Sequence, residues 1–298
     1  MPSSAVVATL IADPRSMRLS DAHIAHLAQA VGGFEQWRWL EDGVAADLLF
    51  SVPLDAVRAA LAAALTGEPI DVIVQSAAHR AKRLLVADMD STLIGQECVD
   101  ELAAYAGVGD RVAAITDRAM RGEIAFEPAL RERVKLLAGL SESVIADVLR
   151  DRITLSPGAR ALVQTMRARG AYVAVVSGGF RQFTRAVRDR LGADEDRANI
   201  LAIQGGKLTG KAIEPILGHD AKLAALKEIA AARGIPLAET LAVGDGANDL
   251  AMLRAAGLGV AYRAKPKVAA SAAARIDHAD LTALLYAQGI PRAEFVEG

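Results

Sequence analysis

The chain has 298 residues, of which 52% are hydrophobic and 23% are charged, and its formal net charge is −2. This length predicts two domains, because one hydrophobic core seldom extends over so many residues, and the balanced charge provides no basic surface to attract a nucleic acid. The single cysteine, Cys98, excludes an intrachain disulfide. With no secretory signal at the start and no run of about 18 apolar residues, we expect a cytoplasmic protein without a membrane partner.

The first eighty residues predict a small unit in which strands and helices alternate. The predicted strands are 6–11, 34–40, 45–52 and 70–75, and the predicted helices are 21–31 and 54–65. The resulting order, strand-helix-strand-strand-helix-strand, is typical of the ferredoxin-like fold. We therefore predict an α+β domain over residues 1–80, followed by a short polar linker at 79–83.

From residue 84 onward, short apolar runs are separated by helical segments. Leu84 to Ala87 is a continuous apolar run, typical of a central strand in a parallel sheet covered on both faces. Strands that alternate with helices predict a doubly wound, Rossmann-like α/β core, which we expect over residues 81–298. Further strands are predicted at 172–176, 200–203, 241–243 and 258–261, and helices at 159–169, 180–191, 222–232 and 250–255.

The stretch from 97 to 151 is too long for a single crossover, and it contains several helical patterns without a convincing strand. We predict that it forms a helical cap, at about residues 95–153, inserted just after the first strand of the core. Ligands of open α/β sheets bind beyond the carboxyl ends of the strands. The cap is therefore expected to lie over the ligand site as a lid.

Two predicted strands of the core end in clusters of Asp. Asp88 and Asp90 follow the strand at 84–87, and Asp245 and Asp249 follow the strand at 241–243. Acidic residues after strands also form turns and cap helices, which is sufficient to explain either cluster alone. Four carboxylates at adjacent strand ends, however, would repel one another strongly without a cation. Oxygen ligands favour Mg²⁺, and the absence of a His/Cys cluster from the sequence argues against zinc.

Two further features suit phosphate chemistry. Ser177, Gly178 and Gly179 follow the strand predicted at 172–176 and precede a helix, where a hydroxyl and glycine amides form an anion site. The same triplet also occurs in ordinary loops. Lys222 opens a later helix and could direct its ammonium group at the same phosphate, although in isolation it could equally be a solvated lysine.

These four groups of residues stand in the order of the four motifs of the haloacid dehalogenase superfamily, which the sequence resembles over about residues 84–285. Within that superfamily it is most similar to the phosphoserine phosphatase family. The matching stretches are Asp88–Glu97 (DMDSTLIGQE), Phe126–Leu140 (FEPALRERVKLLAGL) and Gly206–Gly210 (GKLTG).

The resemblance implies a mechanism. Asp88 would attack phosphorus and form an aspartyl-phosphate, while Asp90 would first protonate the leaving oxygen and then deprotonate the hydrolytic water. Mg²⁺ would bind the Asp88 carboxylate, the Asp90 backbone carbonyl and Asp245, with Asp249 holding the water shell of the metal. The groups that would neutralise the phosphate oxygens are Ser177, Gly178, Gly179 and Lys222.

The resemblance also implies the substrate, O-phospho-L-serine, whose hydrolysis to L-serine and phosphate is the last step of serine biosynthesis. Glu97 would bind its ammonium group and Arg133 its carboxylate. Met120 and Phe126 would form an apolar wall, and Asn248 is a further expected substrate contact. Without the resemblance, Arg133 could belong to a charged helix surface.

Two alternatives to this function stay open in different degrees. A related phosphatase or phosphotransferase could act on another small phosphomonoester, such as a sugar phosphate or homoserine, but a neutral sugar needs no pair of charged cap residues like Glu97 and Arg133. A regulator without catalysis would be expected to lack Asp88, Asp90 or Asp245, and the sequence has all three.

The role of the N-terminal domain is open as well. Its order of elements resembles an ACT domain, a regulatory type that often binds amino acids, but residues 13–16 lack the Gly that ligand-binding copies usually have after the first strand. Serine binding, formation of a homodimer and a purely structural role are the alternatives.

Overall fold

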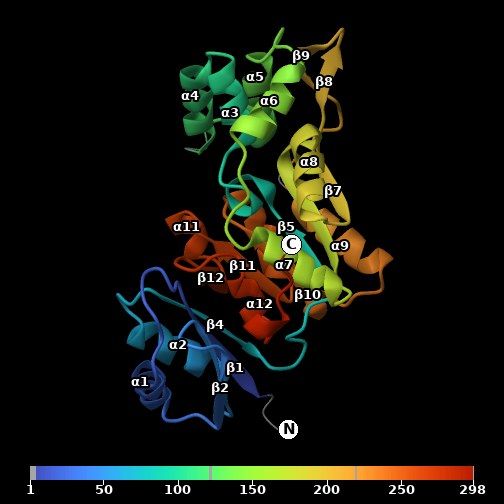
Figure 1. Cartoon of the computed structure of the whole chain (residues 1–298). Helices are drawn as coiled ribbons and strands as arrows, with labels where there is room; N and C mark the ends of the chain where they lie inside the picture. The colour runs from blue at the N-terminus through green and yellow to red at the C-terminus, as the bar shows by residue number, and fades with distance from the viewer. Residues whose placement is uncertain (1–4, 121–122, 219, 298) are drawn as a thin grey trace.

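The computed structural model describes residues 5–120, 123–218 and 220–297. A six-stranded sheet with its helices occupies the middle of the molecule (Figure 1). A four-stranded sheet lies at one end of this core, and the helices α3 to α6 lie at the opposite end. Within the described ranges, none of the helices has both the length and the apolar character needed to cross a membrane.

The N-terminal region, which contains the four-stranded sheet, has the predicted order of strands and helices. Its members are β1 (Val6–Ala12), α1 (Asp21–Val31), β2 (Gln36–Glu41), β3 (Ala45–Phe50), α2 (Leu54–Ala64) and β4 (Ile70–Ser76). The strands lie in the order β2-β3-β1-β4, and each neighbouring pair is antiparallel. Ser20 caps the start of helix α1, where its side chain accepts a hydrogen bond from the His23 amide, and Gly32 caps its end with a φ of 89°, which a glycine adopts without strain.

The central sheet is wholly parallel, in the order β12-β11-β10-β5-β6-β7. Its strands are β5 (Leu84–Ala87), β6 (Tyr172–Phe180), β7 (Glu195–Asn199), β10 (Thr240–Gly244), β11 (Leu258–Tyr262) and β12 (Ala274–Ile276). The helices after the cap are α7 (Ala159–Ala168), α8 (Arg181–Leu191), α9 (Ala221–Ala232), α10 (Leu250–Ala255), α11 (Pro266–Ala269) and α12 (Ala283–Ala287), with short 3₁₀ turns at Leu237–Glu239, Ala247–Asp249 and Arg292–Glu294.

Helices cover both faces of this sheet, which explains why the central strand β5 is apolar throughout. Leu85 and Ala87 of β5 pack in one core cluster together with residues of α7, α8 and α12. Leu84 and Val86 point to the other face, where they join residues of α9 and α10. Successive side chains of a strand alternate between faces, so every residue of β5 is buried. The predicted doubly wound α/β fold is confirmed.

The strand predicted at 200–203 does not belong to the parallel sheet. It forms β8 (Leu201–Gln204), which pairs antiparallel with β9 (Lys207–Ala212) in a separate hairpin. The edge position next to β6 is taken instead by β7, which the sequence did not predict because its residues, EDRAN, are mostly polar. An edge strand tolerates this composition since it has a neighbour on one side only, and Asp196 accepts hydrogen bonds from Thr184 and Arg188.

The cap consists of the helices α3 (Cys98–Tyr105), α4 (Gly109–Met120), α5 (Phe126–Lys135) and α6 (Ser143–Asp151). The two chain segments that join it to the core pair with each other, since the Gly95 amide bonds to the Thr154 carbonyl at 3.2 Å. The β8–β9 hairpin also contacts the cap, through bonds from the Gly139 amide to Leu208 and from the Leu208 amide to Leu140. The limits given for the N-terminal domain (1–80), for the core (81–298) and for the cap (about 95–153) stay predictions.

The four-stranded sheet is bonded to the C-terminal part of the core. The buried Asp71 on β4 accepts backbone hydrogen bonds from Asp277 at 2.8 Å, His278 at 3.1 Å and Ala279 at 2.8 Å. Arg80 pairs with Asp47 and also donates to the carbonyls of residues 286 and 287. These contacts fix the N-terminal sheet on the side of the core away from the cap.

Candidate active site

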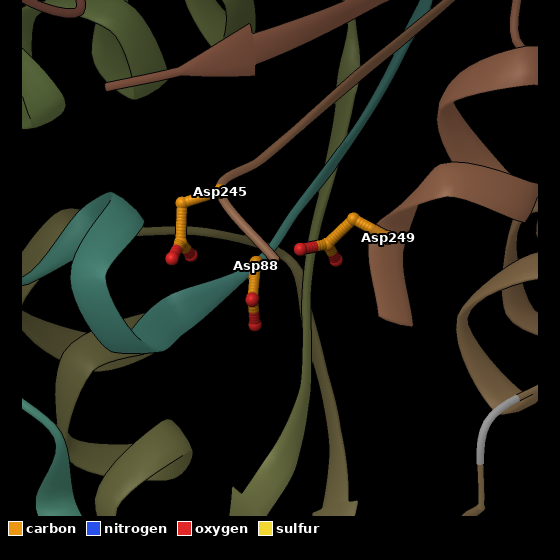
Figure 2. Close-up of side chains that lie close together, drawn as sticks. All are labelled: Asp88, Asp245 and Asp249. Carbon is orange, nitrogen blue, oxygen red and sulfur yellow. The ribbon is translucent and has the colours of Figure 1, made fainter. Parts of the chain in front are cut away.

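Three carboxylates meet at the carboxyl ends of the neighbouring strands β5 and β10. Asp88 follows β5 and precedes the irregular turn Met89–Leu93, in which Asp90 and Ser91 have non-helical backbone angles, and Asp245 and Asp249 follow β10. Carboxylate oxygens of the three residues lie within 4.8 Å of one another, and Figure 2 shows Asp88 between the other two. Parallel neighbours bring their carboxyl ends to the same edge of the sheet, so the two Asp clusters of the sequence form one site.

Lys222 partly balances this charge. Its Nζ lies 2.6 Å from Asp88 Oδ2 and 2.6 Å from Asp249 Oδ1, and all three side chains are buried. Burial and the nearby Asp249 raise the pKa of Asp88 well above its usual value, although Lys222 opposes the shift. Burial disfavours the charge on Lys222, but its two carboxylate partners outweigh that effect and raise its pKa. A net negative charge remains on the cluster, and this favours binding of a cation.

The turn after β10 needs glycine to bring Asp249 into this cluster. A Cβ atom at Gly244 would lie 2.3 Å from Asp249 Cγ. The Gly246 amide donates to Asp249 Oδ2 at 2.9 Å and thereby fixes the carboxylate. On the other side of the cluster, the buried Thr92 donates to Asp245 Oδ1 at 3.2 Å. The sequence analysis did not single out Thr92, although its place soon after Asp88 and Asp90 was a usable signal.

Asp90 lies next to the Ser177–Gly179 segment. Ser177 Oγ donates to Asp90 Oδ2 at 3.1 Å and itself accepts from the Gly179 amide at 2.8 Å. The Cys98 amide, at the start of the cap, donates to Asp90 Oδ1 at 3.0 Å. Burial raises the pKa of Asp90, against the effect of these hydrogen bonds. The carboxyl group is therefore held in place from both the core and the cap.

The Ser177–Gly179 segment differs from the prediction in its secondary structure. It belongs to β6, which continues to Phe180, and the following helix α8 begins only at Arg181. A Cβ atom at Gly178 would lie 3.1 Å from Phe126 Cζ of the cap, and one at Gly179 would lie 2.8 Å from Asp90 Oδ2. The two glycines thus allow close approach of the cap and of a carboxylate, and a side chain at either place would have to displace Phe126 or Asp90.

Replacing Gly179 with Ala should lower kcat/KM for a phosphomonoester by about 100-fold, because the added methyl group must displace Asp90 or Ser177 and small misplacements of reacting groups are costly. The steady-state rate of phosphate release measures this. Gly109→Ala is the control, since its Cβ would meet only Ala104 Cα at 3.7 Å. Equal rates for both variants would show that the close approach of Gly179 to Asp90 does not matter.

The cap residues predicted to select the substrate are also near the cluster. Ser91 donates to Glu97 Oε1 at 2.7 Å, and desolvation by its surroundings together with Asp90 raises the pKa of Glu97 to about 7, although part of this side chain is exposed. Burial lowers the pKa of the half-buried Arg133, while Asp100, Glu97 and Asp90 act in the opposite direction. The charges of these acidic residues therefore act on Arg133, whose Nε donates to the Ala129 carbonyl of its own helix at 3.4 Å.

A small cavity joins the cap to the phosphate site. It is lined by Phe126 of the cap together with Val176, Ser177, Gly178, Gly218, Ala221, Lys222 and Asn248 of the core. The geometry thus brings together most of the residues that the sequence singled out, while their roles stay predictions. The side chain of Met120 lies outside the described part of the structure. Sequence analysis missed Ser91 and Asp100, neither of which stands out by residue type.

Comparison with known proteins assigns the family. The sequence model of the haloacid dehalogenase-like hydrolases matches residues 85–254, which is more than half of the chain. The chain belongs to this family. The resemblance seen in the four motifs is therefore confirmed.

The haloacid dehalogenase-like chain is also similar to curated phosphoserine phosphatases. It is 48% identical over 245 residues to the one from Streptomyces coelicolor, covering 82% of this chain and 60% of that protein. It is 46% identical to the one from Streptococcus thermophilus, covering 67% of this chain and 93% of that protein. The chain thus spans less than two thirds of the length of the first of these relatives.

Solved structures are also similar to the chain. A haloacid dehalogenase family hydrolase from Salmonella enterica serovar Typhi has a TM-score of 0.84 and 29% identity, and the match covers 95% of this chain and 98% of that one. A phosphoserine phosphatase solved as a phospho-aspartyl intermediate analogue has a TM-score of 0.65 and 42% identity, and the match covers 69% of this chain and 98% of that one.

Proposed function

We propose that the chain hydrolyses O-phospho-L-serine to L-serine and phosphate, through an aspartyl-phosphate on Asp88. The observation that carries the proposal is the buried cluster of Asp88, Lys222 and Asp249 next to Asp90, with the charged cap residues Glu97 and Arg133 beside it. Similar proteins named phosphoserine phosphatases support it, as does the phospho-aspartyl analogue described for one of them.

In this mechanism Asp88 is the nucleophile. The Met89 amide holds its Oδ1 at 2.7 Å, and Oδ2 faces Lys222. Attack of a carboxylate oxygen on phosphorus forms the aspartyl-phosphate, and the bond to the serine oxygen breaks. Lys222, Ser177 and the Gly178 and Gly179 backbone stabilise the charge on the phosphate oxygens.

Asp90 moves the proton. In its protonated form it donates to the leaving serine oxygen, and the resulting carboxylate then removes a proton from the water that attacks the aspartyl-phosphate. Its bonds to Ser177 and to the Cys98 amide keep the carboxyl group beside the phosphate site. Attack by this water breaks the bond between Asp88 and phosphorus. This regenerates the Asp88 carboxylate, releases phosphate and leaves Asp90 protonated for the next cycle.

The donor set at this site fits Mg²⁺. Three carboxylates within 4.8 Å of one another offer only oxygen ligands, which a hard divalent cation prefers. Asp88, the Asp90 carbonyl and Asp245 would hold the ion, with Asp249 binding its water shell. When bound, the cation supplies positive charge that offsets the repulsion between Asp88 and the substrate phosphate.

Glu97 and Arg133 favour an amino-acid phosphate over other small esters. A carboxylate binds a guanidinium through paired hydrogen bonds, and an ammonium group suits Glu97. A sugar phosphate has neither a carboxylate nor an ammonium group, so Arg133 would be buried without a substrate partner in such a complex. This favours the last step of serine biosynthesis as the reaction of the chain.

The test is phosphate release from a panel of esters with and without Mg²⁺. We expect phosphoserine to have a kcat/KM at least about 100-fold above those of sugar phosphates. Treatment with EDTA should remove activity, and Mg²⁺ but not Zn²⁺ should restore it. Equal rates for phosphoserine and sugar phosphates would contradict the proposed substrate, while full activity in EDTA would contradict the metal.

A further inference from the structure

Strand β6 bulges where it carries the Ser177–Gly179 segment past β7. Val176 pairs with Arg197, and the next pair is Phe180 with Asn199, so the register shifts across the segment. A bulge removes ladder partners from the residues within it, and a carbonyl that is partly buried, as at Gly178, then needs another donor. The Asn199 side chain supplies one, because its Nδ2 donates to the Gly178 carbonyl at 2.9 Å.

The same side chain also holds the segment that leads to Lys222. Asn199 Oδ1 accepts from the Leu217 amide at 2.7 Å, and Nδ2 approaches the Leu217 carbonyl at 3.5 Å. Asn199 is only 2% exposed. One buried amide therefore joins the strand of the phosphate site to the segment just before α9, whose second residue is Lys222.

The bond to Gly178 is relayed to Asp90 through a peptide plane. In a trans peptide the carbonyl and the following N–H point in opposite directions. When Asn199 holds the Gly178 carbonyl, the Gly179 amide points away from Asn199 and donates to Ser177 Oγ at 2.8 Å. Ser177 Oγ in turn donates to Asp90 Oδ2 at 3.1 Å. Asn199 thus holds the orientation of a peptide whose N–H contacts Ser177, and Ser177 in turn bonds to Asp90.

We propose that Asn199 is a positioning residue of the phosphate site: it orients the Gly178–Gly179 peptide and ties it to Leu217, in the segment just before the helix that carries Lys222. Asn199 contacts none of the groups proposed to react, so it acts through Gly178 and Leu217. The inference rests on the proposed phosphatase function but not on serine as the substrate, because its contacts lie on the phosphate side of the site.

The experiment compares three variants of the full chain. Asn199→Leu removes both kinds of hydrogen bond, and Asn199→Asp keeps the size and the acceptor for the Leu217 amide but loses the donor to Gly178. Gln182→Met is the matched control, because Gln182 brackets the Leu201 backbone in the same way, with bonds of 3.0 and 3.3 Å to Leu201 rather than to Gly178 or Leu217. Thermal unfolding checks that each variant is folded. If Asn199→Leu is unfolded, the near-isosteric Asn199→Asp still tests the inference.

Both Asn199 variants should lower kcat by about 100-fold, and equally for phosphoserine, phosphoethanolamine and p-nitrophenyl phosphate. They should also raise the inhibition constant of inorganic phosphate by about tenfold, whereas Gln182→Met stays within about threefold of the parent chain. The common loss on all esters distinguishes a phosphate-site role from a role in the cap.

Three results would overturn the inference: Asn199 variants within threefold of the parent chain, an equal loss in Gln182→Met, or a loss confined to phosphoserine. If the parent chain prefers another ester, the proposed substrate fails, but the comparison is made with that ester and the Asn199 inference is still tested. If the parent chain hydrolyses none of these esters, calorimetry of inorganic phosphate binding tests the Asn199 inference. The Asn199 variants should then bind phosphate about tenfold more weakly than the parent chain, and equal binding would overturn the inference.

Discussion

Asp88→Asn should abolish phosphate release, with kcat reduced by at least about 10⁴-fold. A carboxamide cannot form an acyl phosphate, so the covalent step has no nucleophile. The fold should survive, because burial and Asp249 already disfavour the charge on Asp88 and Lys222 keeps Asp249 as a partner at 2.6 Å. Thermal unfolding should therefore give a Tm near that of the parent chain.

The nucleophile can also be identified directly. Acid quenching during turnover of phosphoserine labelled on phosphorus should trap a hydroxylamine-sensitive phosphoprotein with the parent chain and none with Asp88→Asn. Asp189→Asn is the matched control, since this exposed carboxylate pairs with Arg188 on α8, away from the site. Activity of Asp88→Asn within about tenfold of the control would assign the nucleophile to another residue.

The strand-end carboxylates could be predicted because two physical signals coincide in the sequence. An uninterrupted apolar run indicates a strand buried on both faces. An Asp directly after such a strand must lie where the parallel strands have their carboxyl ends. Asp88 and Asp245 satisfy both conditions, and β5 and β10 are indeed neighbours. The contact of Lys222 with Asp88 and Asp249 was harder to foresee, since residue type alone does not distinguish a buried lysine from a solvated one.

Asn199 and β7 show what the sequence could not reveal. An edge strand needs no apolar run, so EDRAN gave no strand signal. The function inferred for Asn199 depends on the bulge in β6, which removes a ladder partner from Gly178. A bulge is a relation between two strands and leaves no mark on either strand alone. For the same reason the glycines of the Ser177–Gly179 segment were predicted at a helix start, although they lie within a strand.

Arg133→Ala should lower kcat/KM for phosphoserine by about 100-fold, because it leaves the substrate carboxylate without its partner in a partly desolvated site. Phosphoethanolamine, which has the ammonium group but no carboxylate, should lose less than about threefold. Steady-state kinetics with both esters measures the difference. Arg131→Ala is the matched control on the same helix, because Arg131 is 47% exposed and pairs with Glu127 and Glu214 rather than with the site.

Glu97→Gln should show the opposite preference. Phosphoserine should again lose about 100-fold in kcat/KM, since a neutral amide replaces the partner of the ammonium group. An ester with the carboxylate but no ammonium group, 3-phosphooxypropanoate, should lose little with Glu97→Gln and much with Arg133→Ala. Two variants and two truncated esters thus form a crossed design, in which a general loss of cap structure would lower all four combinations alike. Equal losses would show that Glu97 and Arg133 maintain the cap and do not recognise the amino-acid end of the substrate.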